Sequence, residues 1–124
     1  QGKKNTYSAQ NDGCIYENPI VVLIDSDSAS ASEILSSALR DNSRAVLVGT
    51  RTYGKGLVQK IFSLPNKSGM NLTIARYLTP NGIDINRKGI EPDYTVNFSH
   101  SDFINDIDPQ LNFAKQYLEK NFKI

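Results

Sequence analysis

Two continuous apolar runs with a helical segment between them dominate the first half of the chain. Residues 19–25 (PIVVLID) and 44–49 (RAVLVG) are rich in β-branched residues, which is typical of strands buried on both faces of a parallel sheet. Residues 30–41 carry apolar side chains at helical spacing. Strand, helix and strand within about 30 residues predict a βαβ unit.

The predicted helix has an N-terminal capping signature and an apolar stripe. Ser30 and Glu33 fit the S-x-x-E capping box, which places the helix start at Ser30. Asp41-Asn42-Ser43 is expected to end the helix. The stripe that would face the sheet consists of Ile34, Leu35, Ala38 and Leu39.

The apolar period changes from helical to strand-like after residue 56. Residues 57–64 and 70–78 alternate apolar and polar side chains and are separated by PNKSG, which predicts a β-hairpin. Residues 79–82 (TPNG) and 89–93 (GIEPD) are predicted turns.

A helix is also expected near the C-terminus, because Asp108 can cap it and Pro109 suits its first position. Its predicted apolar stripe is Leu111, Ala114, Leu118 and Phe122. Residues 1–18 are polar without a clear period, and we interpret them as a connecting segment or as a strand whose partners are absent.

Composition excludes several classes of partner. The 124 residues suffice for one small domain, and 39% hydrophobic with 22% charged residues fits a globular protein. A net charge of +1 gives no reason to expect nucleic acid or an anionic membrane as partner. No apolar run approaches the ~18 residues that span a bilayer. Cys14 and His100 lie in polar stretches and are expected to be a loop cysteine without a role and an exposed loop histidine.

The glycine-rich stretch GTRTYGKG (49–56) resembles a phosphate-binding loop only in part. Such a loop needs Ser or Thr after its lysine to bind Mg²⁺, whereas Gly56 follows Lys55 here. It should also lead into a helix, whereas LVQKIF has strand character. Nucleotide binding is therefore disfavoured.

A serine-lysine chemistry explains the glycine loop and the serine run SASASE together. Ser30 is placed at a helix N-terminus, where free backbone N–H groups can stabilise an oxyanion. Lys55, between two glycines, is the lysine that could enter an apolar cleft, and burial favours the neutral amine that a base requires. Two readings stay open on these residues alone: Ser30 acts only as a cap, or it pairs with His100 as its base.

The segment from IVVLIDSDSASASEI to YGKGLVQ closely resembles the C-terminal processing peptidases, or tail-specific proteases, which are serine proteases with a Ser–Lys dyad. ARYLTPNGIDINRKGIEPD and DPQLNFAKQYL also match this family, so the resemblance covers about residues 19–120. The resemblance implies that Ser30 is the nucleophile, Lys55 the general base and the backbone N–H of Ala31 an oxyanion donor. Gln59 matches a glutamine that orients the lysine in several members. Lys55 and Gln59 would lie about 13 Å apart on an ideal strand, so direct contact requires a turn or bulge between them.

The resemblance further implies an α/β fold of the crotonase and Clp protease class, with a mixed sheet flanked by helices. It divides the chain into the connecting segment 1–18, the C-terminal half of a serine protease domain at 19–97, and a helical tail at 98–124. The upstream half and a PDZ domain are absent from this sequence, so the chain alone is expected to be inactive and prone to self-association through exposed apolar surface.

The implied substrate is a protein or peptide with an accessible C-terminal end, cleaved through an acyl-enzyme without any metal or organic cofactor. The implied location is the periplasm or cell envelope of a bacterium. The alternative hypothesis is a non-catalytic peptide-binding module of the same fold.

Overall fold

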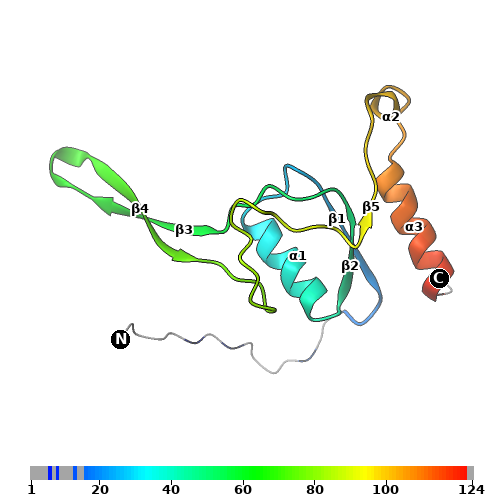
Figure 1. Ribbon diagram of the computed structural model, residues 1–124, viewed down its shortest axis with the longest axis horizontal. Helices are drawn as coiled ribbons and strands as arrows, with labels where there is room; N and C mark the ends of the chain where they lie inside the picture. The colour runs from blue at the N-terminus through cyan, green and yellow to red at the C-terminus, as the bar shows by residue number, and fades with distance from the viewer. Residues whose placement is uncertain (1–5, 7, 9–12, 14–15, 123–124) are drawn as a thin grey trace.

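A small parallel sheet lies between two helices, and a long hairpin extends away from it (Figure 1). The structure is a computed structural model that describes residues 6, 8, 13 and 16–122. Cys14 falls outside the described residues. The predicted α/β class, with a βαβ unit, a hairpin and a C-terminal helix, is confirmed. The sheet is parallel throughout, because the antiparallel strands form a separate two-stranded sheet.

The parallel sheet brings the ends of its two main strands to one edge. Its strands are β1 (Ile20–Ile24), β2 (Ala45–Gly49) and β5 (Tyr94–Thr95), in the order β1-β2-β5. Ile24 lies opposite Gly49 in the register, and the N–H of Thr50 donates to the Ile24 carbonyl at 2.9 Å. The serine segment after β1 and the glycine loop after β2 therefore leave the sheet side by side.

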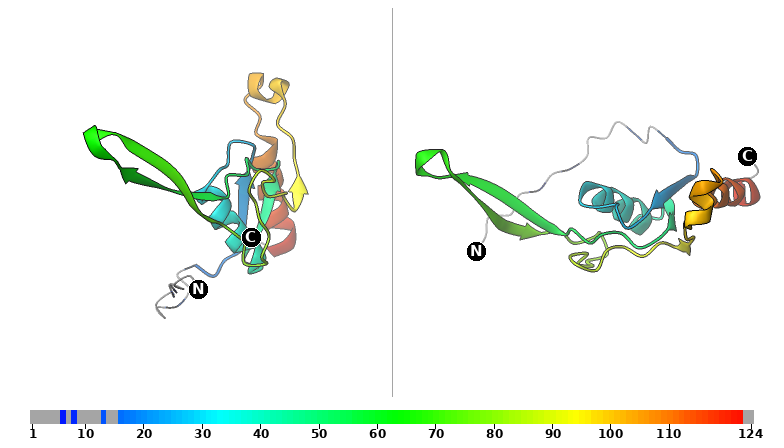
Figure 2. Two further views of the ribbon diagram at one scale, coloured as in Figure 1. Left: turned by 60° about the vertical axis from the view of Figure 1, so that its left-hand side comes forward. Right: turned by 90° about the horizontal axis from the view of Figure 1, so that it is seen from above.

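The two helices that pack on the sheet cover opposite faces, as Figure 2 shows. Helix α1 (Ala31–Asp41) packs on β2, and α3 (Pro109–Phe122) packs on β1 and β2. Because helices cover both faces, the central strand β2 is the most buried strand of the sheet. This burial removes its apolar side chains from water, which stabilises the fold. The core cluster consists of Ile24, Leu47, Ile85 and Ile90, with Val22 and Tyr77 packed against it.

The predicted apolar stripe of α1 is wrong, because this helix turns its polar side to the core. Ile34 is 39% and Leu35 62% exposed, whereas Glu33, Ser36 and Ser37 are buried. The two serine hydroxyls donate back to helix carbonyls, Ser36 to Ser32 at 2.7 Å and Ser37 to Ile34 at 3.2 Å. Small side chains whose hydroxyls are satisfied within the helix can face a sheet without the cost of an unpaired polar group.

The hairpin has no large partner within the described part of the chain. Strands β3 (Leu57–Ser63) and β4 (Gly69–Arg76) pair antiparallel, joined by a turn that contains the short 3₁₀ segment η1 (Pro65–Lys67). Each of these strands packs mainly against the other rather than against the remaining helices and strands. The large exposed apolar side chains here are Val58, Ile61, Phe62, Leu64, Met70, Leu72 and Ile74.

The C-terminal helix starts as the sequence predicts, but its stripe is only partly right. Asp108 accepts from the Leu111 N–H at 2.9 Å, with Pro109 at the first helical position. Ala114 is buried, whereas Leu111 and Phe122 are exposed. Tyr94 of β5 instead contacts Phe113 and Tyr117, with ring centroids 5.3 Å apart in both pairs.

A short helix, α2 (His100–Ile104), precedes α3 and was not predicted. His100 is its first residue and is exposed, so it lies in a helix rather than a loop. None of the described helices combines the length and hydrophobicity that a membrane-crossing segment requires.

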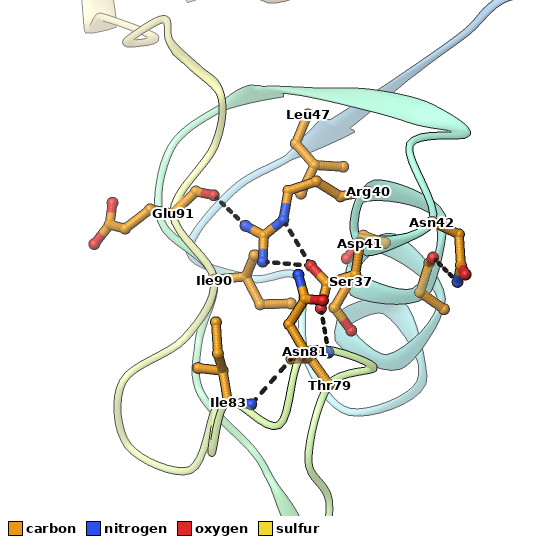
Figure 3. A network of polar contacts seen from close by, with 12 residues as sticks. Ser37, Arg40, Asp41, Asn42, Leu47, Thr79, Asn81, Ile83, Ile90 and Glu91 are labelled. Atoms are coloured by element: carbon orange, nitrogen blue, oxygen red, sulfur yellow. Dashed lines mark hydrogen bonds and ion pairs between the residues drawn. The ribbon is translucent and has the colours of Figure 1, made fainter.

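A polar network fastens the C-terminal end of α1 to the chain beyond the hairpin (Figure 3). The carboxylate of Asp41, 2% exposed, accepts from the Arg40 guanidinium at 3.1 Å and from the Asn81 N–H at 3.1 Å. Burial acts to raise the pKa of Asp41, but hydrogen bonds from Thr79, Asn81 and Arg40 outweigh it, and this pKa lies below its ordinary value of 3.8. The network positions the segment that carries Ile85 and Ile90 into the core.

Candidate active site

Ser30 occupies a strained turn between β1 and α1. It is the N-cap residue of α1, with φ of 52° and ψ of −112°. Positive φ is costly for a residue with a Cβ and persists only where the surroundings enforce it. A serine on a sharp strand-to-helix turn is the arrangement that presents a nucleophilic hydroxyl at the head of a helix.

The capping interaction at Ser30 runs mainly in one direction. The Ser30 N–H donates to Oε2 of Glu33 at 3.0 Å, as expected for a capping box. The Glu33 N–H approaches the Ser30 side chain as the other half of the box, but this contact falls short of a full hydrogen bond. Capping and a chemical role are therefore compatible at Ser30, because this contact uses the hydroxyl only weakly.

Glu33 is the residue that joins the serine turn to the glycine loop. It is fully buried, and each of its carboxylate oxygens accepts two hydrogen bonds. Oε1 accepts from the Thr52 hydroxyl at 2.6 Å and the Gly54 N–H at 2.7 Å. Oε2 accepts from the Lys55 N–H at 2.8 Å as well as from Ser30. A buried carboxylate is tolerated because hydrogen bonds to charged groups are the strong ones.

The glycine loop can follow this path because its backbone approaches another segment closely. Gly54 has φ of +91°, and a Cβ there would lie 2.8 Å from the Gly89 nitrogen. The Arg87 N–H donates to the Gly54 carbonyl at 2.8 Å. The glycines flanking Lys55 thus allow close backbone packing against residues 86–89.

The side chain of Lys55 is exposed in this structure. It lines a pocket of about 470 Å³ with Asp27, Ala29 and Tyr53, directly beside the Ser30 turn. Within the described residues no hydrogen bond joins Lys55 to the Ser30 hydroxyl. The fold therefore brings the backbones of Ser30 and Lys55 close together, whereas no hydrogen bond of the described residues joins their side chains.

Gln59 lies in the hairpin, and its Oε1 accepts from the Asn71 side chain at 3.1 Å. The hairpin has an irregularity between Val58 and Gln59, so the strand between Lys55 and Gln59 is not ideal. A bulge was the condition for contact with Lys55, but the described hydrogen bonds of Gln59 include none to that residue. Its orienting role stays a prediction.

Ala31 is the first residue of α1, directly after Ser30. Its N–H has no acceptor among the hydrogen bonds of the described residues, whereas Ser32 and Ile34 donate to Ala29 and Ser30. A free N–H beside Ser30, at the positive end of a helix dipole, has the position that an oxyanion donor requires.

Sequence reasoning missed the functional weight of two residues. Glu33 was interpreted only as half of a capping box, and Thr52 was not singled out. The signal for Glu33 was its helical spacing with Ser36 and Ser37, because a carboxylate on a face of small side chains can approach a sheet only if several donors meet it there. Thr52 carries no local signal, because its partners are distant in the sequence.

Comparison with known proteins agrees with this geometry. Residues 1–96 match the model of peptidase family S41. The segment is 57% identical over 76 residues to carboxyl-terminal-processing peptidase 1, chloroplastic, of Arabidopsis thaliana, covering 61% of this chain and 16% of that protein. It is 51% identical over 96 residues to the carboxyl-terminal-processing protease of Picosynechococcus sp., covering 77% of this chain and 23% of that protein.

Solved structures resemble the fold as well. A photosystem II D1 C-terminal processing protease matches with a TM-score of 0.62 and 48% identity, over 64% of this chain and 20% of that chain. The tricorn protease matches with a TM-score of 0.70 at 22% identity, over 82% of this chain and 10% of its own, which is a likeness of fold alone.

An α/β fold with a strained serine at the head of its first helix is an arrangement that serine hydrolases also use. The chain belongs to peptidase family S41, among the C-terminal processing proteases, a family of serine peptidases that act on proteins. It corresponds to less than a quarter of the relatives described above. Some relatives are chloroplastic and others are from bacteria, so a bacterial periplasm or envelope stays a prediction for this chain.

Proposed function

We propose that this chain is the dyad-bearing part of a longer serine endopeptidase that cleaves proteins near their C-termini. The observation that carries the proposal is the shared acceptor of the two motifs: Oε2 of Glu33 accepts from the N–H groups of both Ser30 and Lys55. A capped helix beside a glycine loop would not by itself require a buried carboxylate that binds both segments. We use the term intact peptidase for a protein that contains this chain together with the rest of a peptidase domain.

The proposed reaction uses Lys55 as the only base. Its neutral amine takes the proton from the Ser30 hydroxyl as that oxygen attacks the peptide carbonyl carbon. The oxyanion forms beside the Ala31 N–H, at the positive end of α1. When the carbon–nitrogen bond breaks, Lys55 returns the proton to the leaving amine, and an ester to Ser30 remains. Lys55 then takes a proton from water as that water attacks the ester carbonyl, and it returns the proton to the Ser30 oxygen when the ester bond breaks, which releases the acid product and restores the neutral amine.

This reaction requires a neutral amine, and the described residues leave Lys55 exposed. Burial of Lys55 is therefore assigned to the rest of the peptidase domain, which would also supply the second oxyanion donor. The isolated chain should be inactive or very slow. Turnover by the pure 124-residue chain equal to that of the intact peptidase would contradict this division of the site.

The test is covalent labelling of Ser30 in the intact peptidase by a fluorophosphonate probe, located by mass spectrometry of the labelled peptide. We expect labelling and cleavage of peptides with a free C-terminal end, both lost in Ser30→Ala and Lys55→Ala. Ser32→Ala and Lys60→Ala are matched controls, because both residues are exposed and close in sequence, and these variants should stay active. Full activity of either dyad variant would end the assignment.

The alternative is a non-catalytic module that binds peptides with the same fold. The strained backbone of Ser30 favours the enzyme, since a binding module gains nothing from it. Absence of labelling at Ser30, together with saturable binding of the same peptides, would favour the module. Cleavage should also increase with pH as the lysine amine loses its proton, and a flat profile from about pH 5 to 9 would exclude a lysine base.

A further inference from the structure

One buried hydroxyl links the carboxylate of Glu33 to the chain segment beyond the hairpin. Thr52 is 4% exposed, and its hydroxyl donates to Oε1 of Glu33 at 2.6 Å. The same hydroxyl accepts from the Ile90 N–H at 2.7 Å. The Thr52 hydroxyl therefore uses its donor and one of its acceptor positions, and its burial keeps water away from both hydrogen bonds.

The backbone around Thr52 is fastened to the same segment. The Thr52 N–H donates to the Ile90 carbonyl at 3.1 Å, which closes a ring of two hydrogen bonds between residues 52 and 90. Gly89 has φ of +72°, and a Cβ there would overlap the Thr52 carbonyl oxygen. Ile90 itself is 3% exposed in the core. Thr52 is thus held by the core on one side and holds Glu33 on the other.

The Thr52 hydroxyl restricts how the Glu33 carboxylate can rotate. Three of the four donors to that carboxylate are backbone N–H groups, from Ser30, Gly54 and Lys55. Thr52 is the only side chain among the donors, and it is the only one anchored to Ile90. Without it, Oε1 keeps a single hydrogen bond and the carboxylate can turn toward other positions, which would shift the backbone of Lys55 relative to Ser30.

We propose that Thr52 is a positioning residue for the Ser30–Lys55 dyad, acting through Glu33. This inference rests on the proposed function, because it assigns Thr52 a part in the same reaction. Thr52 touches neither substrate nor the reacting atoms. Its effect is to set the geometry in which Lys55 meets Ser30, and displacements of about 1 Å at a reacting pair reduce rates by about 100-fold.

The test compares three variants of the intact peptidase. Thr52→Val keeps the volume and removes the hydroxyl, and Thr52→Ser keeps the hydroxyl. Thr79→Val is the matched control, because Thr79 is also 4% exposed and its hydroxyl also accepts a backbone N–H, from Ile83, in the network of Figure 3. That network lies at the other end of α1, away from the dyad.

We expect Thr52→Val to lower kcat by about 10- to 100-fold with KM changed by less than about twofold, whereas Thr52→Ser stays within about threefold of the parent. Thr79→Val should keep kcat per folded molecule unchanged. Equal losses of kcat in Thr52→Val and Thr79→Val, or failure of Thr52→Ser to restore kcat, would overturn the inference.

A second measurement separates this inference from the proposed function. In the same proteins, amide hydrogen exchange reports the Gly54 and Lys55 N–H groups that Glu33 binds. Thr52→Val should speed their exchange by about 10-fold, and Thr79→Val should leave it unchanged. If the parent neither cleaves nor labels, the proposed function fails while the exchange result still decides whether Thr52 holds Glu33. If the parent cleaves and exchange at Lys55 is unaltered in Thr52→Val, the positioning role fails alone.

Discussion

The backbone N–H of Lys55 donates to Oε2 of Glu33 at 2.8 Å, and Glu33 lies in the first turn of the helix that Ser30 caps. The carboxylate therefore connects two motifs that are 25 positions apart in the sequence. Glu33 is fully buried, and its two carboxylate oxygens accept four hydrogen bonds from N–H and O–H groups held in place by the fold. The candidate site is thus organised around a residue that does not itself react.

Replacing Glu33 by Gln should destabilise the fold. The amide keeps the size, but its NH₂ group would face N–H or O–H donors at one of the two oxygen positions. Hydrogen bonds to a charged acceptor contribute about 1.5–3 kcal/mol each, so the free energy of unfolding should fall by about 3 kcal/mol. Urea denaturation followed by circular dichroism measures the change.

The control for that variant is Glu91→Gln. The Glu91 side chain is 72% exposed and lies 3.9 Å from the Arg51 guanidinium, 63% exposed. An exposed pair of this kind contributes about 0–1 kcal/mol, so this variant should unfold almost as the parent does. If the Glu33→Gln protein is as stable as Glu91→Gln, the buried carboxylate does not stabilise the fold in the way that its four hydrogen bonds indicate.

Ser30 variants should separate a capping role from a chemical one. Since the Ser30 hydroxyl makes only the weaker half of the capping box, Ser30→Ala should change the free energy of unfolding by less than about 0.5 kcal/mol, against about 1 kcal/mol for loss of an ordinary cap. Asp108→Ala, which removes a cap that does bond to Leu111 at 2.9 Å, should show the ordinary loss. Ser30→Gly should stabilise by about 1 kcal/mol, because glycine adopts positive φ without strain. Thermal unfolding of the three variants tests this order.

The acid stability of the fold should depend on Asp41. Its pKa is lowered in the folded protein, so its charged form stabilises the fold above the unfolded value near 3.8, and this contribution is lost as pH falls through the lower folded value. Asp41→Asn should therefore destabilise the protein at pH 6 and lose that difference progressively below pH 3.8. Unfolding midpoints in urea at several pH values measure it. A constant difference down to pH 2 would contradict the role of the charge.

The exposed face of the hairpin should drive self-association of the isolated chain. Register pairs place Phe62 with Met70 and Lys60 with Leu72 on one face, and alternation adds Ile74. An apolar face without a partner promotes association between copies. Leu72→Thr with Ile74→Thr should shift the chain toward monomer in sedimentation velocity, whereas Thr73→Ser on the opposite face should not. Monomeric behaviour of the parent at high concentration would contradict this expectation.

Local patterns predicted most of the elements. The apolar runs at 19–25 and 44–49 became β1 and β2, and the alternation after residue 56 became the hairpin. The cap at Asp108 with Pro109 was also predicted, since capping depends on neighbours in the chain. The two-residue strand β5 and the five-residue helix α2 carry too few residues for a periodic signal.

The burial of α1 could not be predicted from its apolar stripe. Helical periodicity shows which residues share a face, but not which face meets the sheet. Glu33 and the serines lie inward because the Glu33 carboxylate finds its donors in the loop around Thr52 and Lys55, about 20 positions later, and the serine hydroxyls find acceptors within the helix. Ile34 and Leu35 are consequently left on the exposed side of the helix.

The sequence alone predicted most of the helices and strands and the two motifs, because strands, caps and turns depend on interactions between residues that are near one another in the chain. Only the tertiary structure decided that Glu33 and Thr52 connect those motifs, since the parallel register of β1 and β2 brings residues after Ile24 beside residues after Gly49. A carboxylate accepts hydrogen bonds from whatever donors lie within about 3 Å, and which donors those are depends on the path of the whole chain.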